Sequence, residues 1–556
     1  MSQPLNATEI AGRSSQMFPT LTAAQIARAA AFGEEKRFAD GALLWDQGDE
    51  RVACCIVLEG ELEVVHPRGR FEDPITVHAV GGFTGEVTML ANRRALVRGR
   101  AKGALRVLRI ELPRFRALVQ TDSELSEIVM RAFILRRVGL LSAGYGDAVV
   151  IGSRHSAASL RLQAFLTRNG HPYRWVDVDR DPDVQALLDE FHVGIDDVPV
   201  LICRGERVLK NPSDAEVAAC LGLNASVDLG VVRDVVICGA GPGGLAAAVY
   251  GASEGLDVLV IEAGAPGGQA ASSSKIENYL GFPTGISGQA LAGRALAQAE
   301  KFGAQLSVAR PALRIHRDES PFRIDLEGGE SIRTRTIVIA TGAEYRKLDI
   351  ADLARFEGVG VYYAATSVES NRCAAEDVIV VGGGNSAGQA ATFLARTSRH
   401  VHLLIRGPDL AASMSRYLIR RIEETPNITL QRNTQIIGLE GSDHLERVTW
   451  REGTGPSVTH AIRHVFSMAG AKPNTDWLRG CVSLDDKGFV ATGIDLKPEI
   501  LRAEGWPLPR PPSLFETSRP RIFAVGDVRS NSVKRVASAV GEGSVCIALV
   551  HKVLAE

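Results

Sequence analysis

Three patterns of hydrophobic and polar residues follow one another along the 556-residue chain. Residues 1 to about 30 have apolar positions at helical spacing, and short alternating apolar segments separated by glycines follow. Alternation with a period of two between turn residues is typical of β-strands. Helical spacing returns after Pro113. The pattern therefore predicts a β-rich first domain, residues 1–141, that is closed by one or two helices.

Strand and helix patterns alternate in residues 147–223. In order they are strand DAVVIG, helix SLRLQAFLTRNG, strand YRWVDVD, helix VQALLDEFHV, strand PVLICRG and helix AEVAACLGL. This alternation predicts a small α/β domain. From about residue 231 such units continue to the C-terminus and include two glycine-rich loops, which indicates two related nucleotide-binding folds.

Composition and charge exclude several classes of protein. The chain has 63 Lys and Arg against 65 Asp and Glu, so nothing in its charge indicates a nucleic acid or an anionic membrane as partner. The first residues lack a basic segment followed by an apolar one, and no later apolar run reaches the roughly 20 residues that span a bilayer. We therefore expect a cytoplasmic protein without a membrane segment.

Cysteine spacing gives no sign of a disulfide framework or a zinc site. The eight cysteines form no CxxC pair and lie at positions 54, 55, 203, 220, 238, 373, 481 and 546. We expect most of them to be buried small hydrophobic residues.

The first glycine-rich loop follows strand DVVICG directly and precedes helix LAAAVYGAS. Glycines at this place let the backbone approach a pyrophosphate at the helix N-terminus. The next strand ends in Glu262, 23 residues after Gly239, where a carboxylate accepts hydrogen bonds from a ribose diol. The candidate dinucleotide-binding residues are Gly239, Gly241, Pro242, Gly243, Gly244 and Glu262.

The second glycine-rich loop lies in VIVVGGGNSAGQAATFLA, and the strand after it ends at Arg406. A guanidinium at this ribose position suits a 2′-phosphate, which favours NADPH over NADH. A solvated charge at a strand end is the alternative interpretation of Arg406. The candidate residues are Gly382, Gly384, Asn385, Ser386, Ala387 and Arg406, with Arg416 as a second arginine.

The motifs of residues 231–556 resemble those of the thioredoxin reductase family of pyridine-nucleotide flavoenzymes. GGQ (267–269) with IENYLGFPTGISGQAL, ATGA (340–343) and IFAVGDV (522–528) stand in that family's order. The resemblance implies a homodimer and an FAD-binding domain in two parts, 231–347 and 469–556, around an NAD(P)H-binding domain, 348–468. It also implies FAD contacts at Gly268, Gln269, Asn278, Thr341, Gly342, Gly526, Asp527, Lys534, Arg535 and Val536. The start of the last helix would stabilise the reduced flavin.

The chain departs from that family where the redox dithiol belongs. The family's Cys-Ala-Thr-Cys is replaced by Ala364-Ala365-Thr366-Ser367, so positions 364 and 367 both lack sulfur. Hydride transfer from NADPH to FAD needs only the orientation of the two rings, and no catalytic side chain is predicted. We expect the electrons to pass to an acceptor other than thioredoxin: a quinone, a small redox carrier or a bound partner. Cys373 is expected to be structural.

The middle domain, 147–223, resembles the glutaredoxin and thioredoxin family. Pro199 stands like that family's cis-proline, but Ser153-Arg154-His155-Ser156 replaces the CxxC. A serine hydroxyl cannot take part in thiol exchange. The resemblance therefore implies a docking or relay module, and an active redox domain that uses Cys203 or Cys220 is the alternative.

The first domain resembles the cyclic nucleotide-binding β-roll, with turn glycines in RFADGALLWDQGDERVACCIVLEGELEVVH. The resemblance implies a binding loop in which Glu86 bonds the ribose 2′-hydroxyl, Arg94 the phosphate, and N–H groups at 85–87 the anion. Arg93 competes with Arg94 for this role. The implied residues are Gly85, Glu86, Val87, Arg94 and Ala95, and Ala95 favours cyclic AMP over a guanine nucleotide. A degenerate roll that serves dimerisation or docking is the alternative.

Three functions follow from these motifs. The first is an FAD-dependent, NADPH-oxidising enzyme under cyclic-nucleotide control. The second is a redox or nucleotide sensor, or an assembly protein, whose turnover is incidental. The third is a disulfide reductase that uses remote cysteines, namely Cys373, Cys203 and Cys220.

Overall fold

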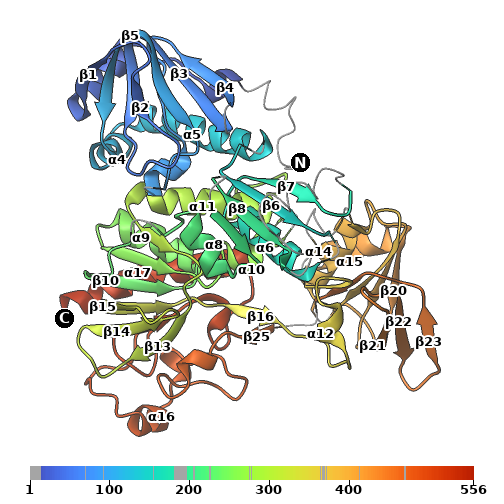
Figure 1. The fold of residues 1–556 in the computed structure, drawn as a ribbon. Helices are drawn as coiled ribbons and strands as arrows, with labels where there is room; N and C mark the ends of the chain where they lie inside the picture. The colour runs from blue at the N-terminus through green and yellow to red at the C-terminus, as the bar shows by residue number, and fades with distance from the viewer. Residues whose placement is uncertain are drawn as a thin grey trace.

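The computed structural model describes residues 14–68, 71–91, 93–143, 145–154, 156–180, 197–204, 207–224, 227–273, 276, 278–363, 365, 370, 372–411, 413–468 and 471–556. Several predicted features lie outside these residues: the helix expected in 184–193, and His155, Ala364 and Ser367. The chain folds into four units, and the fourth is inserted between the two segments of the third (Figure 1). We call them the N-terminal unit (14–143), the middle unit (145–224), the large unit (227–345 and 471–556) and the inserted unit (348–468).

The N-terminal unit is an antiparallel β-roll packed on helices. Its strands are β1 (Glu34–Phe38), β2 (Leu43–Trp45), β3 (Cys54–Arg68), β4 (Phe71–His78) and β5 (Arg98–Ile110), in the order β1-β5-β3-β4 with β2 beside β5. Its helices are α2 (Ser14–Met17), α3 (Ala23–Ala29), η1 (Ala30–Phe32), η2 (Val87–Ala91), α4 (Leu112–Thr121) and α5 (Ser123–Ala143). A capping box between Thr22 and Gln25 starts α3. Phe83, Phe115 and Phe133 pack together between the roll and the helices.

The middle unit is a four-stranded sheet in the order β7-β6-β8-β9. Its elements are β6 (Ala148–Gly152), α6 (Ala157–Arg168), β7 (Tyr173–Asp177), β8 (Val200–Cys203), β9 (Arg207–Lys210) and α8 (Asp214–Cys220). Strands β6 and β7 are parallel, whereas β8 and β9 are antiparallel to their neighbours. Pro199 follows a cis peptide bond. A disulfide between Cys203 and Cys220 joins β8 to α8, although the cysteine spacing indicated no disulfide.

The large unit contains a seven-stranded sheet built from both of its segments. The strands are β10 (Val232–Cys238), β11 (Val258–Ile261), β12 (Gln305–Ser307), β13 (Ala312–His316), β14 (Phe322–Leu326), β15 (Ser331–Ile339) and β26 (Ile522–Ala524). Their order is β12-β11-β10-β15-β14-β13, with β26 parallel to β15. The helices of the unit are α9 (Pro242–Ser253), α10 (Gly268–Ala271), α11 (Gly288–Phe302), α16 (Pro498–Ala503) and α17 (Val536–Ala555), with η4 (Asp476–Leu478), η5 (Gly493–Asp495) and η6 (Gly526–Val528).

The inserted unit repeats this plan on a smaller scale. Its parallel sheet has the order β17-β24-β18-β19-β20, and β21-β22-β23 form a separate antiparallel sheet. The strands are β17 (Val361–Tyr362), β18 (Asp377–Val381), β19 (His400–Leu404), β20 (Ile428–Gln431), β21 (Thr434–Glu440), β22 (Arg447–Glu452), β23 (Ser457–His460) and β24 (Val465–Ser467). The helices are α12 (Leu353–Phe356), α14 (Asn385–Leu394) and α15 (Arg416–Glu423).

Two short antiparallel strands connect the large and inserted units, β16 (Ala343–Tyr345) and β25 (Ala471–Pro473). They form a narrow bridge between the two units (Figure 1). The chain therefore leaves and re-enters the large unit at a single place. The cavity described below lies beside this bridge.

Helix α17 corrects one expectation from the sequence. By length and composition it is long and apolar enough to cross a bilayer, although no such run was expected. In the structure it packs along α9, and its Cys546, Ile547, Val550 and Val553 are fully buried in the core of the large unit. The apolar character of α17 is therefore explained by its position in the core.

Candidate functional site

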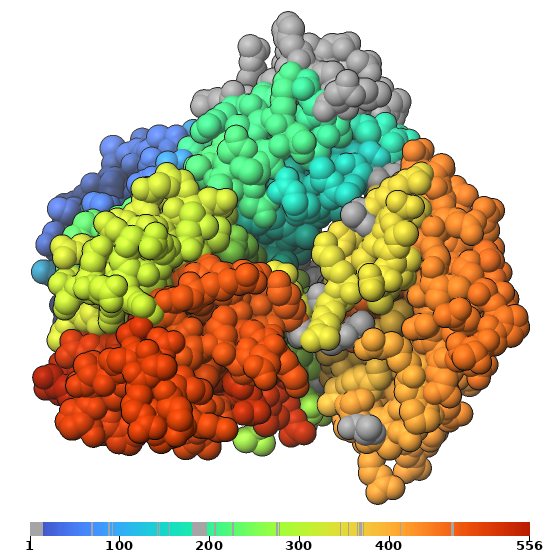
Figure 2. Space-filling view, turned by 90° about the horizontal axis from the view of Figure 1, so that it is seen from below, coloured from blue at the N-terminus to red at the C-terminus, as the bar shows by residue number. Residues whose placement is uncertain are grey.

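A cavity of about 1790 Å³ lies between the large unit and the inserted unit. Both glycine-rich loops open into it, and one residue of the middle unit, Arg168, lines it as well. In the view from below, a hollow separates the large unit from the inserted unit, and teal residues of the middle unit border it (Figure 2). The site is thus formed by three units.

The first loop connects β10 to α9 through a turn that only glycine tolerates at two positions. Gly239 has a φ of +112°, and a Cβ there would lie 2.3 Å from the carbonyl oxygen of Ala340. A Cβ on Gly244 would lie 1.9 Å from the carbonyl oxygen of Gly239. These close approaches bring the N-terminus of α9, which starts at Pro242, to the cavity wall. Helix N-termini of this kind bind phosphate groups.

Glu262 is held against this loop by backbone hydrogen bonds. The N–H of Ala240 donates to its Oε2 at 2.7 Å, and the N–H of Gly264 donates to its Oε1 at 2.9 Å. Burial raises the pKa of Glu262, and these N–H groups and the charge of Arg168 oppose that rise. Glu262 lines the cavity, and a carboxylate oxygen can accept more than one hydrogen bond. The residue can therefore accept the hydroxyl groups of a ribose.

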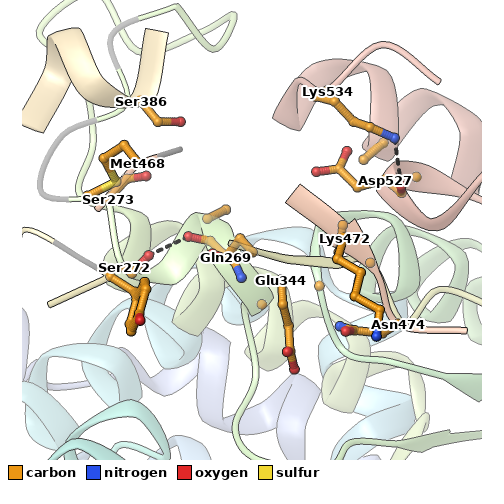
Figure 3. Close-up of a pocket in the computed structure, with 18 of the residues that line it drawn as sticks. Gln269, Ser272, Ser273, Glu344, Ser386, Met468, Lys472, Asn474, Asp527 and Lys534 are labelled. Carbon is orange, nitrogen blue, oxygen red and sulfur yellow. Dashed lines mark hydrogen bonds between the residues drawn. The ribbon is translucent and has the colours of Figure 1, made fainter. Parts of the chain in front are cut away.

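The residues that the sequence assigned to FAD gather on the large-unit wall of the cavity. Gln269 lies near its centre, and Asp527 and Lys534 lie opposite Ser386 and Met468 (Figure 3). The predicted FAD residues that line the cavity are Gly239, Gly241, Pro242, Gly243, Glu262, Gly268, Gln269, Asn278, Thr341, Gly342, Gly526, Asp527, Lys534, Arg535 and Val536. Gly244 does not line it, because its role is to pack α9 against the loop.

Lys534 precedes α17 and faces Asp527. Its Nζ donates to the carbonyl oxygen of Asp527 and to Oγ of Ser532, both at 2.6 Å, and lies over the ring of Phe489. Burial raises the pKa of Asp527 and lowers that of Lys534. The N-terminus of α17 and this lysine give one end of the cavity a positive potential.

The bridge between the units contributes residues that the sequence did not single out. Oγ1 of Thr341 donates to the carbonyl oxygen of Asn474, and Nδ2 of Asn474 donates to that of Thr341, both at 2.9 Å. Glu344, Lys472 and Asn474 line the cavity (Figure 3). No sequence signal identifies them, because β16 and β25 meet only through the tertiary fold.

The second loop has the same construction as the first. Gly382 has a φ of +140°, and a Cβ there would lie 2.4 Å from the carbonyl oxygen of Met468. Gly384 is the N-cap of α14, and Oδ1 of Asn385 accepts the N–H of Ser415 at 2.7 Å. Gly382, Gly384, Asn385 and Ser386 line the cavity. Ala387 does not line it, since it is fully buried in the core of the inserted unit.

The two arginines proposed for a 2′-phosphate differ in position. Arg406 follows β19, is exposed and lines the cavity. It forms no ion pair with any residue in the described part of the chain. Arg416 begins α15 and does not line the cavity. Arg406 therefore stays the candidate residue for the 2′-phosphate, and Arg416 does not.

Cys373, Cys54 and Cys55 do not form an exposed thiol pair that could replace the missing dithiol. Cys373 is fully buried, and its Sγ lies near Ser370 and Ser398. Cys54 and Cys55 are adjacent in β3 but point into different cores, and burial raises the pKa of both thiols, that of Cys55 to about 12. A thiolate is the reactive form, so these residues are unreactive.

The predicted cyclic-nucleotide loop lies at the junction with the large unit and not at the cavity. Nε of Arg94 is 3.0 Å from Oε1 of Glu50, and Nη1 of Arg137 is 3.7 Å from Oε1 of Glu86. The carbonyl oxygen of Gly85 accepts a hydrogen bond from Arg136, Val87 begins η2, and the N–H of Ala95 donates to Asp49. The loop is therefore engaged by carboxylates and arginines of the protein itself.

Arg93 extends this network into the large unit. Its Nη2 lies 3.8 Å from Oε1 of Glu300 in α11, and Glu300 is buried while Arg93 is largely so. Burial raises the pKa of Glu300 to about 7, although Arg93, Arg116 and Arg137 act in the other direction. Helix η2 packs directly on α11.

Known proteins resemble this chain in two segments. Residues 233–543 match the family described as pyridine nucleotide-disulphide oxidoreductase, and residues 35–122 match the cyclic nucleotide-binding domain. The thioredoxin reductase of Mycolicibacterium smegmatis is 32% identical over 327 residues, which are 58% of this chain and 97% of that protein. The NADPH-dependent thioredoxin reductase 3 of Arabidopsis thaliana is 31% identical over 57% of each chain.

Solved structures agree with this pattern. The thioredoxin reductase of Lactococcus lactis, in its FR conformation, has a TM-score of 0.52 and 27% identity and covers 58% of this chain and 99% of its own. These comparisons confirm the thioredoxin reductase-like and cyclic nucleotide-binding resemblances read from the sequence. Neither matched segment includes the middle unit.

Proposed function

Because the chain belongs to the pyridine nucleotide-disulphide oxidoreductase family, we propose that it is an FAD-dependent enzyme that oxidises NADPH and passes the electrons to an acceptor other than thioredoxin. One observation carries this proposal. Both dinucleotide loops open into a single cavity, while Ala364 and Ser367 replace the family's two redox cysteines. Cytoplasmic location and homodimerisation stay predictions.

The residues of the cavity fit FAD on its large-unit side. The glycines of the first loop leave room for a pyrophosphate at α9, and Glu262 offers a carboxylate to the ribose. Lys534 and the N-terminus of α17 would supply positive potential to a reduced flavin, which carries negative charge. When bound, FAD supplies the hydride-accepting ring. The residues of the chain orient it and hold it next to the second loop.

The inserted unit fits a second dinucleotide. Its loop of Gly382 and Gly384 opens toward the same cavity, and Arg406 lies exposed at the ribose position. Since Arg406 has no carboxylate partner among the described residues, its guanidinium is available to a 2′-phosphate. We therefore favour NADPH over NADH as the electron donor.

The acceptor assay distinguishes this function from its alternatives. NADPH oxidation is followed with a soluble quinone and, separately, with an oxidised bacterial thioredoxin, with an authentic thioredoxin reductase as the matched control. We expect turnover with the quinone and none with thioredoxin. Thioredoxin reduction at a rate close to the control enzyme would overturn the proposal. Flavin reduction without turnover on either acceptor would favour the sensor function.

The N-terminal unit is proposed to control the enzyme through cyclic AMP. Its loop is joined to the large unit by the contact of η2 with α11 and by Arg93 beside Glu300. Helix α11 in turn packs on α10, which carries Gln269 on the cavity wall. A cyclic phosphate that binds Arg94 must replace Glu50. Ligand binding can therefore change the loop and, through α11, the wall of the flavin cavity.

The middle unit is proposed to be a glutaredoxin- or thioredoxin-like docking module. The strand order β7-β6-β8-β9, with one parallel and two antiparallel pairings, supports this resemblance. Ser153 and Ser156 stand where the family has thiols. The Cys203–Cys220 disulfide is buried in the core of the unit, so it offers no exposed sulfur to a partner.

A further inference from the structure

The middle unit places an arginine on the wall of the cavity. We propose that Arg168 is part of the FAD site and binds the adenosine and pyrophosphate half of the cofactor. This inference rests on the proposed function, because it requires that FAD occupy the large-unit side of the cavity. It gives the middle unit, which lacks the CxxC motif, a definite task, which is to complete a cofactor site in the neighbouring unit.

The position of Arg168 points to this half of the cofactor. Arg168 is the last residue of α6, and its Nη2 lies 3.4 Å from the carbonyl oxygen of Ala265 and 3.5 Å from that of Gly268. Ala265 lies between Glu262 and the GGQ motif, and Gly268 is the middle residue of that motif. The guanidinium therefore stands beside the ribose-binding carboxylate and next to the loop that receives the pyrophosphate.

The contacts of Arg168 leave most of its hydrogen-bonding capacity unused. Both carbonyl contacts are at the long limit for a hydrogen bond, and both use the same nitrogen. In the part of the chain that the structure describes, no carboxylate lies within ion-pair distance of Arg168. A guanidinium has five donors and matches the geometry of phosphate oxygens. A dinucleotide is the ligand in this cavity that offers such oxygens.

The electrostatics of the site agree with this assignment. The charge of Arg168 acts on Glu262 and lowers its pKa against the effect of burial. A positive group at this place favours the ionised form of Glu262, which is the form that accepts the ribose hydroxyl groups. The same positive charge attracts the diphosphate of the cofactor.

The middle unit is fixed firmly enough to position this side chain. Nε2 of Gln289 in α11 donates to the carbonyl oxygen of Thr167, the residue before Arg168, at 2.9 Å. Asn224 and the backbone of Val308 form two reciprocal hydrogen bonds of 2.8 Å. Val308 and Ala309 of the large unit also belong to the apolar core of the middle unit. The two units therefore behave as one packed body at this junction.

The test measures FAD affinity directly. Apoprotein is prepared from the full chain, and FAD binding is followed by flavin fluorescence for wild type, Arg168→Ala, Arg168→Lys and Arg174→Ala. Arg174 is the matched control, because it is an exposed arginine of β7 in the same unit that does not line the cavity. Thermal unfolding of each apoprotein shows whether the fold is intact.

We expect the dissociation constant for FAD to rise about 10-fold or more in Arg168→Ala, as the loss of one charge-assisted hydrogen bond predicts. Arg168→Lys should lie between Ala and wild type, because it keeps the charge without the planar fork. Arg174→Ala should stay within about twofold of wild type. The apoproteins should unfold at the same temperature, whereas the rise in unfolding temperature on adding FAD should be smaller in Arg168→Ala.

Two results would overturn the inference. The first is an FAD affinity of Arg168→Ala within about twofold of wild type. The second is a lower unfolding temperature of the Arg168→Ala apoprotein together with an unchanged rise in that temperature on adding FAD. Arg168 would then be a structural residue of the junction. Failure of wild type to bind FAD at all would instead refute the proposed function, so the two failures are distinguishable.

Discussion

At the scale of single residues, the two glycine-rich loops differ mainly in what stands at the end of the following strand. Glu262 is partly buried and fixed by two backbone N–H groups, whereas Arg406 is exposed at the cavity. A carboxylate selects hydroxyl groups, and a guanidinium selects a phosphate. In the proposed function, one side chain at each loop therefore distinguishes the two cofactors, while the backbones of the two loops are similar.

The role of Arg406 can be tested by substitution. Arg406→Ala should raise the dissociation constant for NADPH by about 10-fold to 100-fold, because a charged hydrogen bond to the 2′-phosphate is lost. The affinity for NADH should be nearly unchanged. Arg416→Ala is the control and should leave both affinities as they are, since Arg416 does not line the cavity. Equal losses for NADPH and NADH would contradict a phosphate-binding role.

Glu300 provides a prediction about pH. Burial raises its pKa from 4.5 to about 7 in the folded protein, while Arg93, Arg116 and Arg137 favour the ionised form and Glu86 opposes it. At pH values between 4.5 and about 7, the Glu300 carboxyl group is ionised in the unfolded chain and protonated in the folded chain. The carboxylate therefore lowers the free energy of unfolding as the pH rises from about 4.5 to 7, by up to about 3 kcal/mol.

Glu300→Gln removes this titration. Thermal unfolding of wild type and variant should be compared at pH 5 and pH 8. The variant should be the more stable of the two at pH 8, and this advantage should shrink or vanish at pH 5. A stability difference that does not change between the two pH values would contradict the account of Glu300.

At the scale of elements, features set by a local sequence pattern were predicted, whereas features that depend on long-range contacts were missed. The strand, loop and helix around Gly239 and those around Gly382 are contiguous in sequence, so their spacing alone predicted both elements and cavity-facing glycines. Asn474 and Arg168 were missed, because each reaches the cavity only through the packing of distant segments. The same reason explains why the Cys203–Cys220 pair was not foreseen: 17 residues separate them without a recognisable motif.

Helix α11 is the element that links the N-terminal unit to the cofactor cavity. It contacts η2 and α4 on one side and α9 and α10 on the other. Nζ of Lys301 at its end donates to Oγ of Ser126 in α5 at 2.8 Å. A sequence pattern could show that α11 is amphipathic, but not that its buried Glu300 faces three arginines of other segments.

Cyclic AMP binding should depend on the pair formed by Arg94 and Glu50. Calorimetry on the full chain is expected to show binding that is lost in Arg94→Gln, because the phosphate loses its charged partner. Glu50→Gln should bind several-fold more tightly than wild type, since Arg94 no longer has to leave a carboxylate. Unchanged affinity in both variants, or no binding by wild type, would favour a roll that only docks the units.

At the scale of the whole molecule, four units are arranged around one cavity. The large and inserted units supply the two dinucleotide loops, and the middle unit supplies Arg168. The N-terminal unit packs on α11 from outside. The sequence predicted the order of these units. Only the fold shows that both dinucleotide loops line one cavity although the chain lacks the family's dithiol.

The central claim is that NADPH reduces the flavin and that the electrons do not continue to a disulfide of this chain. An anaerobic titration of the FAD-loaded protein with NADPH, followed by the flavin absorbance, tests it most directly. The account predicts complete bleaching after one equivalent of NADPH per chain, because FAD takes two electrons and the Cys203–Cys220 disulfide is buried away from partners. A requirement for two equivalents, as a flavin coupled to a reducible disulfide would show, or no bleaching at all, would contradict it.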